Sequence, residues 1–241
     1  MKIKTQSSSS PGETRVARAP ALVEPSVMNF IKGLSRNVLG RCATAEEIRE
    51  SAATIAAAAG ARTSAVAAML LMEEAVVRLA SPWFWKLLSR GPQPREMAEF
   101  VGTVRSGTPF DAAISRVIGS EQYIQRAATR GIGGSERDVN LVQSIQIDLL
   151  GRLAETGELS RNIKQLRAIG PSRYALEILR SVEFRRNYVV RLHHEVLERT
   201  PVEAQMQGWL KRENLGLDLL QIRVQLLAGD EYFNRWQERA D

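Results

Sequence analysis

The chain has 241 residues, of which 44% are hydrophobic and 25% charged, as in an ordinary globular protein. Its formal net charge of +6 comes from 33 Lys and Arg against 27 Asp and Glu. This mild excess of positive charge suits an acidic partner. Proteins that bind nucleic acids usually cluster their positive charge more strongly along the chain. The one cysteine, Cys42, excludes a disulfide within the chain and a zinc site built from cysteines.

The first 25 residues predict a disordered tail. They contain four consecutive serines, three prolines and few large apolar side chains. No apolar segment of a signal peptide is visible there, so we expect a cytoplasmic protein. Export without a classical signal peptide is an alternative, because Ser-rich unstructured N-termini also serve as secretion signals for needle-type export machines.

The most apolar stretch, Ala52–Ala80, predicts two soluble alanine-rich helices around Gly60 rather than a transmembrane segment. Arg62, Glu73 and Glu74 interrupt this stretch, and alanine is only weakly apolar.

From Asn29 onward the pattern is helical. Apolar residues recur at intervals of three and four, for example at Leu217, Leu220, Val224 and Leu227. We find no alternating strand pattern and no Asn-Gly or Asp-Gly hairpin signal. The predicted fold class is therefore all-α.

Capping residues mark the predicted helix starts. Thr44 and Glu47 have the spacing of a capping box. Thr200, Pro201 and Glu203 predict an N-cap, the first helical position and the third helical position of a later helix.

A glycine-rich segment divides the helical part of the chain. Residues 129–137 contain three glycines and predict a linker between helical regions 26–128 and 138–241. Ser135 and Asp138 are expected to cap the helix that follows.

A Leu-x-Arg tripeptide recurs four times. It ends at Arg41, Arg90, Arg152 and Arg199. An aromatic residue that follows an acidic or amide residue comes 32 or 33 positions after three of these arginines. These aromatics are Tyr123, Phe184 and Tyr232, whereas Glu74 and Ala75 stand at this place in the first unit. The pattern predicts repeated three-helix units of about 47–50 residues, packed as a bundle or a short array.

The motif residues are expected to serve the fold. Each arginine falls at a helix C-terminus, where a cation stabilises the helix by about 0.3–1 kcal/mol. The acidic residue beside the aromatic falls near the start of a later helix, so the two charges can pair if the unit folds back. The aromatic ring would then fill the gap between helices.

Several of these strings resemble a known family. "LLGR", "RSVEFRRNYV" and "GDEYFNRW" are similar to a bacterial helical repeat domain of unknown function that is found in secreted RTX-type proteins. That domain is itself similar in pattern to the phycobilisome linker domain. The resemblance covers residues 29–236 and implies assembly or scaffolding, with no catalytic residues to carry over. The chain departs from the family in its first unit, which lacks the aromatic, and it has no calcium-binding nonapeptides.

Residues suited to catalysis or metal binding are few. His193 and His194 are adjacent, so on a helix they point about 100° apart and cannot easily hold one metal ion. The string from His194 to Glu198 lacks the second histidine of a zincin helix. The sequence thus predicts no enzyme activity, no metal and no cofactor.

Six basic residues predict a basic helical face for partner binding. They are Lys164, Arg167, Arg173, Arg185, Arg186 and Arg191. Such a face would bind an acidic protein surface, or, as an alternative, the phosphates of a nucleic acid or membrane.

Taken together, the sequence predicts a non-catalytic helical scaffold or linker that mediates protein–protein assembly and has no transmembrane segment. One alternative is an exported effector or surface-associated bacterial protein that uses the Ser-rich tail as its signal. A second alternative is nucleic-acid or phosphate-surface binding through the basic face.

Overall fold

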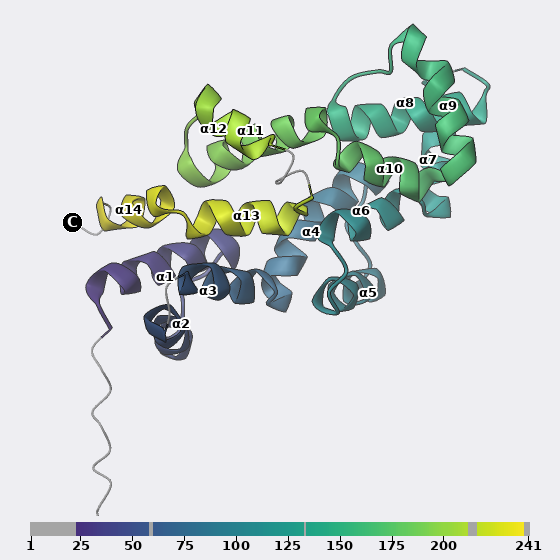
Figure 1. Ribbon diagram of the computed structural model, residues 1–241. Helices are drawn as coiled ribbons and strands as arrows, with labels where there is room; N and C mark the ends of the chain where they lie inside the picture. Colours follow the sequence, from purple (N-terminus) through teal and green to yellow (C-terminus); the bar gives the residue numbers. More distant parts are fainter. Residues whose placement is uncertain (1–22, 58–59, 133, 212–215, 239–241) are drawn as a thin grey trace, which may run out of the picture.

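The computed structural model describes residues 23–57, 60–132, 134–211 and 216–238, and this part contains fourteen α-helices and no strand (Figure 1). The all-α class predicted from the apolar periodicity is confirmed. Of the predicted tail, residues 1–22 lie outside the described residues, and the first helix begins at Pro25.

The first seven helices form one half of the molecule. They are α1 (Pro25–Val38), α2 (Ala45–Ala57), α3 (Ala61–Leu70), α4 (Glu73–Leu88), α5 (Pro94–Arg105), α6 (Phe110–Ile118) and α7 (Glu121–Arg130). The alanine-rich stretch spans parts of three helices rather than two. Gly60, with φ at 84°, separates α2 from α3 as expected. A further break follows α3, because Glu73 and Glu74 begin α4, where the helix dipole favours acidic side chains.

The last seven helices form the other half. They are α8 (Arg137–Leu150), α9 (Thr156–Ile169), α10 (Pro171–Leu179), α11 (Val182–Leu197), α12 (Glu203–Trp209), α13 (Leu219–Ala228) and α14 (Asp230–Glu238). The predicted cap of α8 is wrong: Glu136 occupies the N-cap. Asp138 instead accepts a hydrogen bond from Arg167 of α9 at 2.6 Å.

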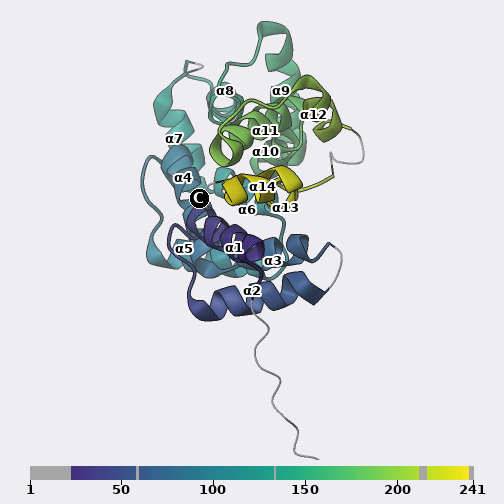
Figure 2. The ribbon, with the colours of Figure 1, turned by 90° about the vertical axis from the view of Figure 1, so that its left-hand side faces the viewer.

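The contacts between the two halves indicate an approximate twofold axis. Helix α6 packs against α10, and α3 packs against α13. Helix α7 packs against α8, and α14 packs against α1, as Figures 1 and 2 show. When α1–α7 are matched in order with α8–α14, the contact of α6 with α10 corresponds to the contact of α13 with α3. In the same way, the contact of α7 with α8 corresponds to the contact of α14 with α1. The halves therefore meet through equivalent surfaces.

Buried apolar side chains line the junctions between the halves. Ile114 and Ile118 of α6 and Tyr174 and Leu179 of α10 are at most 2% exposed. Each large aliphatic side chain buried in this way stabilises the fold by roughly 1.5–3 kcal/mol. An ion pair accompanies them: the exposed Arg180, which follows α10, donates to the buried Asp111 of α6 at 2.8 Å.

Two of the three motif aromatics occupy equivalent places at the ends of the halves. The Tyr123 hydroxyl donates to Asp148 of α8 at 2.9 Å. The Tyr232 hydroxyl accepts a hydrogen bond from the Asn37 amide of α1, also at 2.9 Å. Asp148 and Asn37 each lie four residues before a motif arginine, so the two contacts correspond. Phe184, the third aromatic, packs between Trp83 and Tyr188.

Candidate functional site

The four motif arginines have corresponding partners. Each donates to the carbonyl of the next residue, to a side chain six residues later and to a side chain 31–33 residues later. The side-chain partners are Glu47 and Glu74 for Arg41, Glu96 and Gln122 for Arg90, Glu158 and Glu183 for Arg152, and Gln205 and Glu231 for Arg199. We call each arginine with these partners an arginine clamp.

A clamp ties three helix ends together. The arginine follows the C-terminus of one helix, and its partner six residues later is the third residue of the next helix. In the first clamp this partner, Glu47, also accepts the backbone N–H of Thr44 at 2.8 Å, which is the predicted capping box. The partner 31–33 residues later lies in the first turn of a further helix. The clamp is therefore a structural device.

The same spacing corrects the predicted start of α12. The N-cap is Val202 rather than Thr200, and Gln205 rather than Glu203 is the third helical residue. The reason is the clamp: Arg199 donates to the Gln205 side chain at 3.0 Å, and the same oxygen accepts the N–H of Val202.

The clamps use the arginine charges within the fold. The hydrogen bonds from Arg41 and from the Thr44 backbone lower the pKa of Glu47 to about 2. Hydrogen bonds from the other clamp arginines likewise lower the pKa of four further carboxyl groups: Glu96, Glu158, Glu183 and Glu231. These arginines already face carboxylates and are not free to bind an outside anion.

The predicted basic face is not a single surface. Three of its residues are exposed on α9 and α10: Lys164, Arg167 and Arg173. Arg185 of α11 is only 1% exposed, so its prediction as a surface residue is wrong. Successive residues on a helix point about 100° apart, which turns Arg186 outward, 3.9 Å from Glu203. Arg191 is exposed and enters a cleft between the halves.

The two histidines and the cysteine lie in different surroundings. The His193 side chain is buried and contacts the Val189 carbonyl at 2.9 Å, and burial lowers its pKa. His194 is exposed beside Thr200, and Cys42 is an exposed free thiol. Within the described ranges, no group of three or more His, Cys, Asp or Glu side chains is arranged to hold a metal ion.

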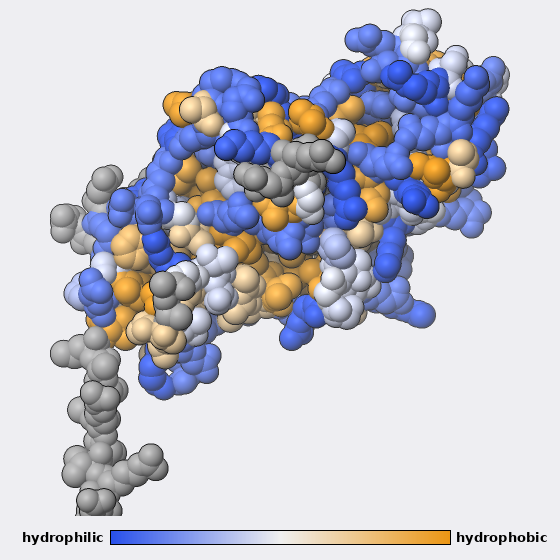
Figure 3. Space-filling view, viewed as in Figure 1, coloured by the Kyte–Doolittle hydropathy of each residue, from blue (hydrophilic) through white to orange (hydrophobic). Residues whose placement is uncertain are grey.

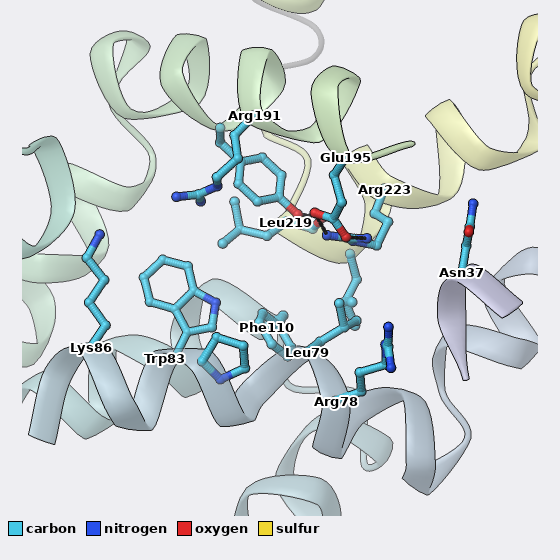
Figure 4. A pocket seen from close by; sticks show the side chains of 13 residues that line it. Asn37, Arg78, Leu79, Trp83, Lys86, Phe110, Arg191, Glu195, Leu219 and Arg223 are labelled. Carbon is cyan, nitrogen blue, oxygen red and sulfur yellow. Dashed lines mark hydrogen bonds and ion pairs between the residues drawn. The ribbon is translucent and has the colours of Figure 1, made fainter. Parts of the chain in front are cut away.

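The cleft that Arg191 enters has a volume of about 450 Å³ and opens between α4 and α11 (Figure 4). These two helices correspond under the approximate twofold axis, so the cleft lies where the halves face each other. Its apolar and aromatic lining consists of Leu79, Pro82, Trp83, Phe110, Tyr188, Leu219 and Leu220. Its polar lining consists of Asn37, Arg78, Lys86, Arg191, Glu195 and Arg223.

One of the basic residues in the cleft forms an ion pair with the acidic residue of the lining. Arg223 is 8% exposed and binds both oxygens of Glu195, at 2.8 and 2.9 Å. Burial raises the pKa of Glu195, but the Arg223 hydrogen bond, together with the charges of Arg223, Arg191 and Arg78, outweighs this effect, and the pKa is lowered.

The other three basic residues, Arg78, Lys86 and Arg191, form no ion pair with any residue of the described part of the chain. Figure 4 shows Lys86 and Arg191 extending into the cleft from opposite walls. Partial burial and then the charge of Arg191 lower the pKa of Lys86.

Aromatic rings lie beside two of these cations. The Lys86 Nζ is 6.0 Å from the centre of the Trp83 ring, and the Arg191 guanidinium is 5.6 Å from that of Tyr188. The cleft thus presents positive charge and flat apolar surface together.

Sequence reasoning found Arg191 but missed Arg78, Lys86 and Trp83. A helical signal was present, because Arg78, Pro82 and Lys86 are spaced four residues apart on one face of α4. The sequence did not show that α11 faces them.

No family model, curated protein or solved structure matches this chain. The resemblance to the helical repeat domain of RTX-type proteins therefore stays a prediction. Among the helices of the described residues, none is long and apolar enough to span a membrane.

Proposed function

We propose that this chain is a non-catalytic helical scaffold that binds another protein. The observation that supports this most is the position of its exposed large hydrophobic residues. In the described ranges these are Leu71, Trp85, Leu153, Val182 and Val202, which are 42–62% exposed. Each lies within five residues of an arginine clamp member in the sequence.

The clamps give these apolar side chains a fixed backbone. Leu153 follows Arg152 directly, and Val182 precedes Glu183, so the Arg152–Glu183 ion pair brings the two hydrophobic residues to the same region. A preorganised apolar contact loses little conformational entropy when it binds. A partner protein would bury these side chains and gain their transfer free energy.

Trp85 is the most exposed of the five, at 62%, and lies near Gly91 in the loop after α4. Tryptophan is enriched among the residues that contribute most to protein interfaces. Figure 3 shows a further gathering of hydrophobic residues between α3 and α13, where Leu71 borders a hollow that Leu70 and Val224 also line. The net charge of +6 makes an acidic partner surface the better fit.

The test is affinity capture with the tagged full chain from its source cells, followed by titration of the recovered partner. Trp85→Ala and Val182→Ser should each weaken binding, by about tenfold or more for the tryptophan. Glu50→Ala, at an exposed position of α2, is the control and should leave binding unchanged. A strictly monomeric chain without a protein partner, or equal binding by all three variants, would refute the proposal. So would recovery of nucleic acid alone, with affinity that falls steeply as salt rises.

A further inference from the structure

We propose that the cleft between α4 and α11 binds a small organic anion with a flat apolar body, an aromatic carboxylate or phosphate. This site goes beyond the proposed scaffold function, because it concerns a small molecule rather than a protein surface.

The positive charge of the cleft indicates that its ligand is an anion. Its lining contains four basic residues and one acidic residue, and the acidic residue is already bound to Arg223. Arg78, Lys86 and Arg191 remain without a carboxylate, and two of them face each other across the cleft (Figure 4). An anion between them would pair with both cations and screen their mutual repulsion.

The clamp arginines, which serve the fold, differ from the cleft cations in their partners. In each clamp the guanidinium has a carboxylate or carboxamide partner at both spacings. Arg191 and Lys86 have no such partner, although each lies beside an aromatic ring of the cleft wall. Cations placed in this way are suited to a ligand that brings its own negative charge.

The walls of the cleft favour a ligand whose remaining part is apolar and flat. Trp83, Phe110 and Tyr188 supply aromatic surface, and Leu79 and Leu219 supply aliphatic surface. A volume of about 450 Å³ lies in the range of pockets that hold small organic molecules. An inorganic anion would leave this apolar surface in contact with water, whereas an aromatic anion would bury it.

The chain's own N-terminal tail is a poor occupant by charge. Residues 1–22 carry Lys2, Lys4, Arg15 and Arg18 against Glu13 alone, so the segment is cationic like the cleft. Like charges disfavour this contact.

A bound anion would also join the two halves. Lys86 and Trp83 belong to the first half, and Arg191 and Tyr188 belong to the second. A ligand that contacts both sets stabilises the native chain in proportion to its concentration above its dissociation constant.

The experiment compares two fluorescent probes that share a ring system. The first is 1-anilinonaphthalene-8-sulfonate, and the second is N-phenyl-1-naphthylamine, which lacks the sulfonate. We expect one saturable site for the sulfonate and roughly tenfold weaker binding of the neutral probe. Both 1-naphthoate and 1-naphthyl phosphate should displace the sulfonate, and their ratio tells which anionic group the cleft prefers.

Four full-length variants locate the site. Lys86→Gln and Arg191→Gln should each weaken binding of the sulfonate probe by roughly tenfold. Lys164→Gln and Arg173→Gln make the same charge changes at exposed positions outside the cleft and should leave its affinity unchanged. All four should melt near the wild-type temperature. Equal affinity for the two probes, or equal weakening in cleft and control variants, would overturn the proposal.

Discussion

Replacing Arg152 by alanine tests whether the arginine clamps hold the fold. The Arg152 guanidinium donates to both oxygens of Glu183, at 2.6 and 2.7 Å, and to Glu158 at 3.1 Å. It also donates to the Leu153 carbonyl at 3.1 Å. The substitution therefore removes the contacts that tie the end of α8 to the starts of α9 and α11.

The expected cost follows from geometry and exposure. The three side chains are 30–42% exposed, so solvent screens each ion pair to about 0.2–1 kcal/mol. The two-point contact with Glu183 belongs at the upper end of that range. Without the arginine, Glu158 and Glu183 also repel each other across the gap. Together these effects predict a loss of about 1–2 kcal/mol in the free energy of unfolding.

The assay is urea unfolding at pH 7 followed by far-ultraviolet circular dichroism. Arg152→Lys should recover about half of the loss, because an ammonium group cannot reproduce the two-point contact with a carboxylate. Arg173→Ala removes the same charge from an exposed position of α10 and serves as the control. A loss below about 0.3 kcal/mol for Arg152→Ala, or full recovery by lysine, would show that the clamp geometry does not stabilise the fold.

Three further predictions concern the same framework. The pKa of Glu47 is about 2 in the folded chain against an ordinary 4.5, so its clamp stabilises the fold above pH 4.5 and loses this effect as the pH falls towards 2; a thermal midpoint that stays constant over this range would contradict the assignment. Arg180→Ala leaves the buried carboxylate of Asp111 without its ion-pair partner and should cost about 1–3 kcal/mol in urea unfolding, because Arg180 itself is exposed to solvent. Replacing both residues by leucine should restore most of that stability, and a double variant no better than the single one would argue against a buried-charge penalty. Tyr123→Phe removes the hydroxyl that donates to Asp148 and should cost about 1 kcal/mol by the same measurement, whereas an unchanged midpoint would mean that the hydrogen bond contributes nothing net.

The sequence by itself determined the all-α class and indicated part of the clamps. Apolar spacing of three and four residues is a local property of the chain, and it predicted the all-α class that the structure has. The acidic residues near the aromatics were expected to pair with the motif arginines, and Arg152 with Glu183 does so. Local chemistry sufficed here, because the clamp partners are helix-terminal residues at recurring separations along the chain.

The tertiary structure alone decided which polar residues are buried. Helix α8 carries Gln143, Gln146 and Asp148, which are at most 8% exposed, although side chains of these types are usually solvated. Each has a partner outside the helix: Gln143 binds the backbone of Ala154, Gln146 binds Tyr174, and Asp148 accepts from the Tyr123 hydroxyl. These partners lie 11–28 residues away in the sequence.

The cleft is a tertiary feature for the same reason. Lys86 and Arg191 are more than a hundred residues apart, and each alone is an ordinary helical cation. They face each other because α6 packs on α10 and α3 on α13, which brings α4 and α11 to opposite walls of one cavity. Periodicity fixes which residues share a helix face, but only the packing of distant helices determines what that face meets.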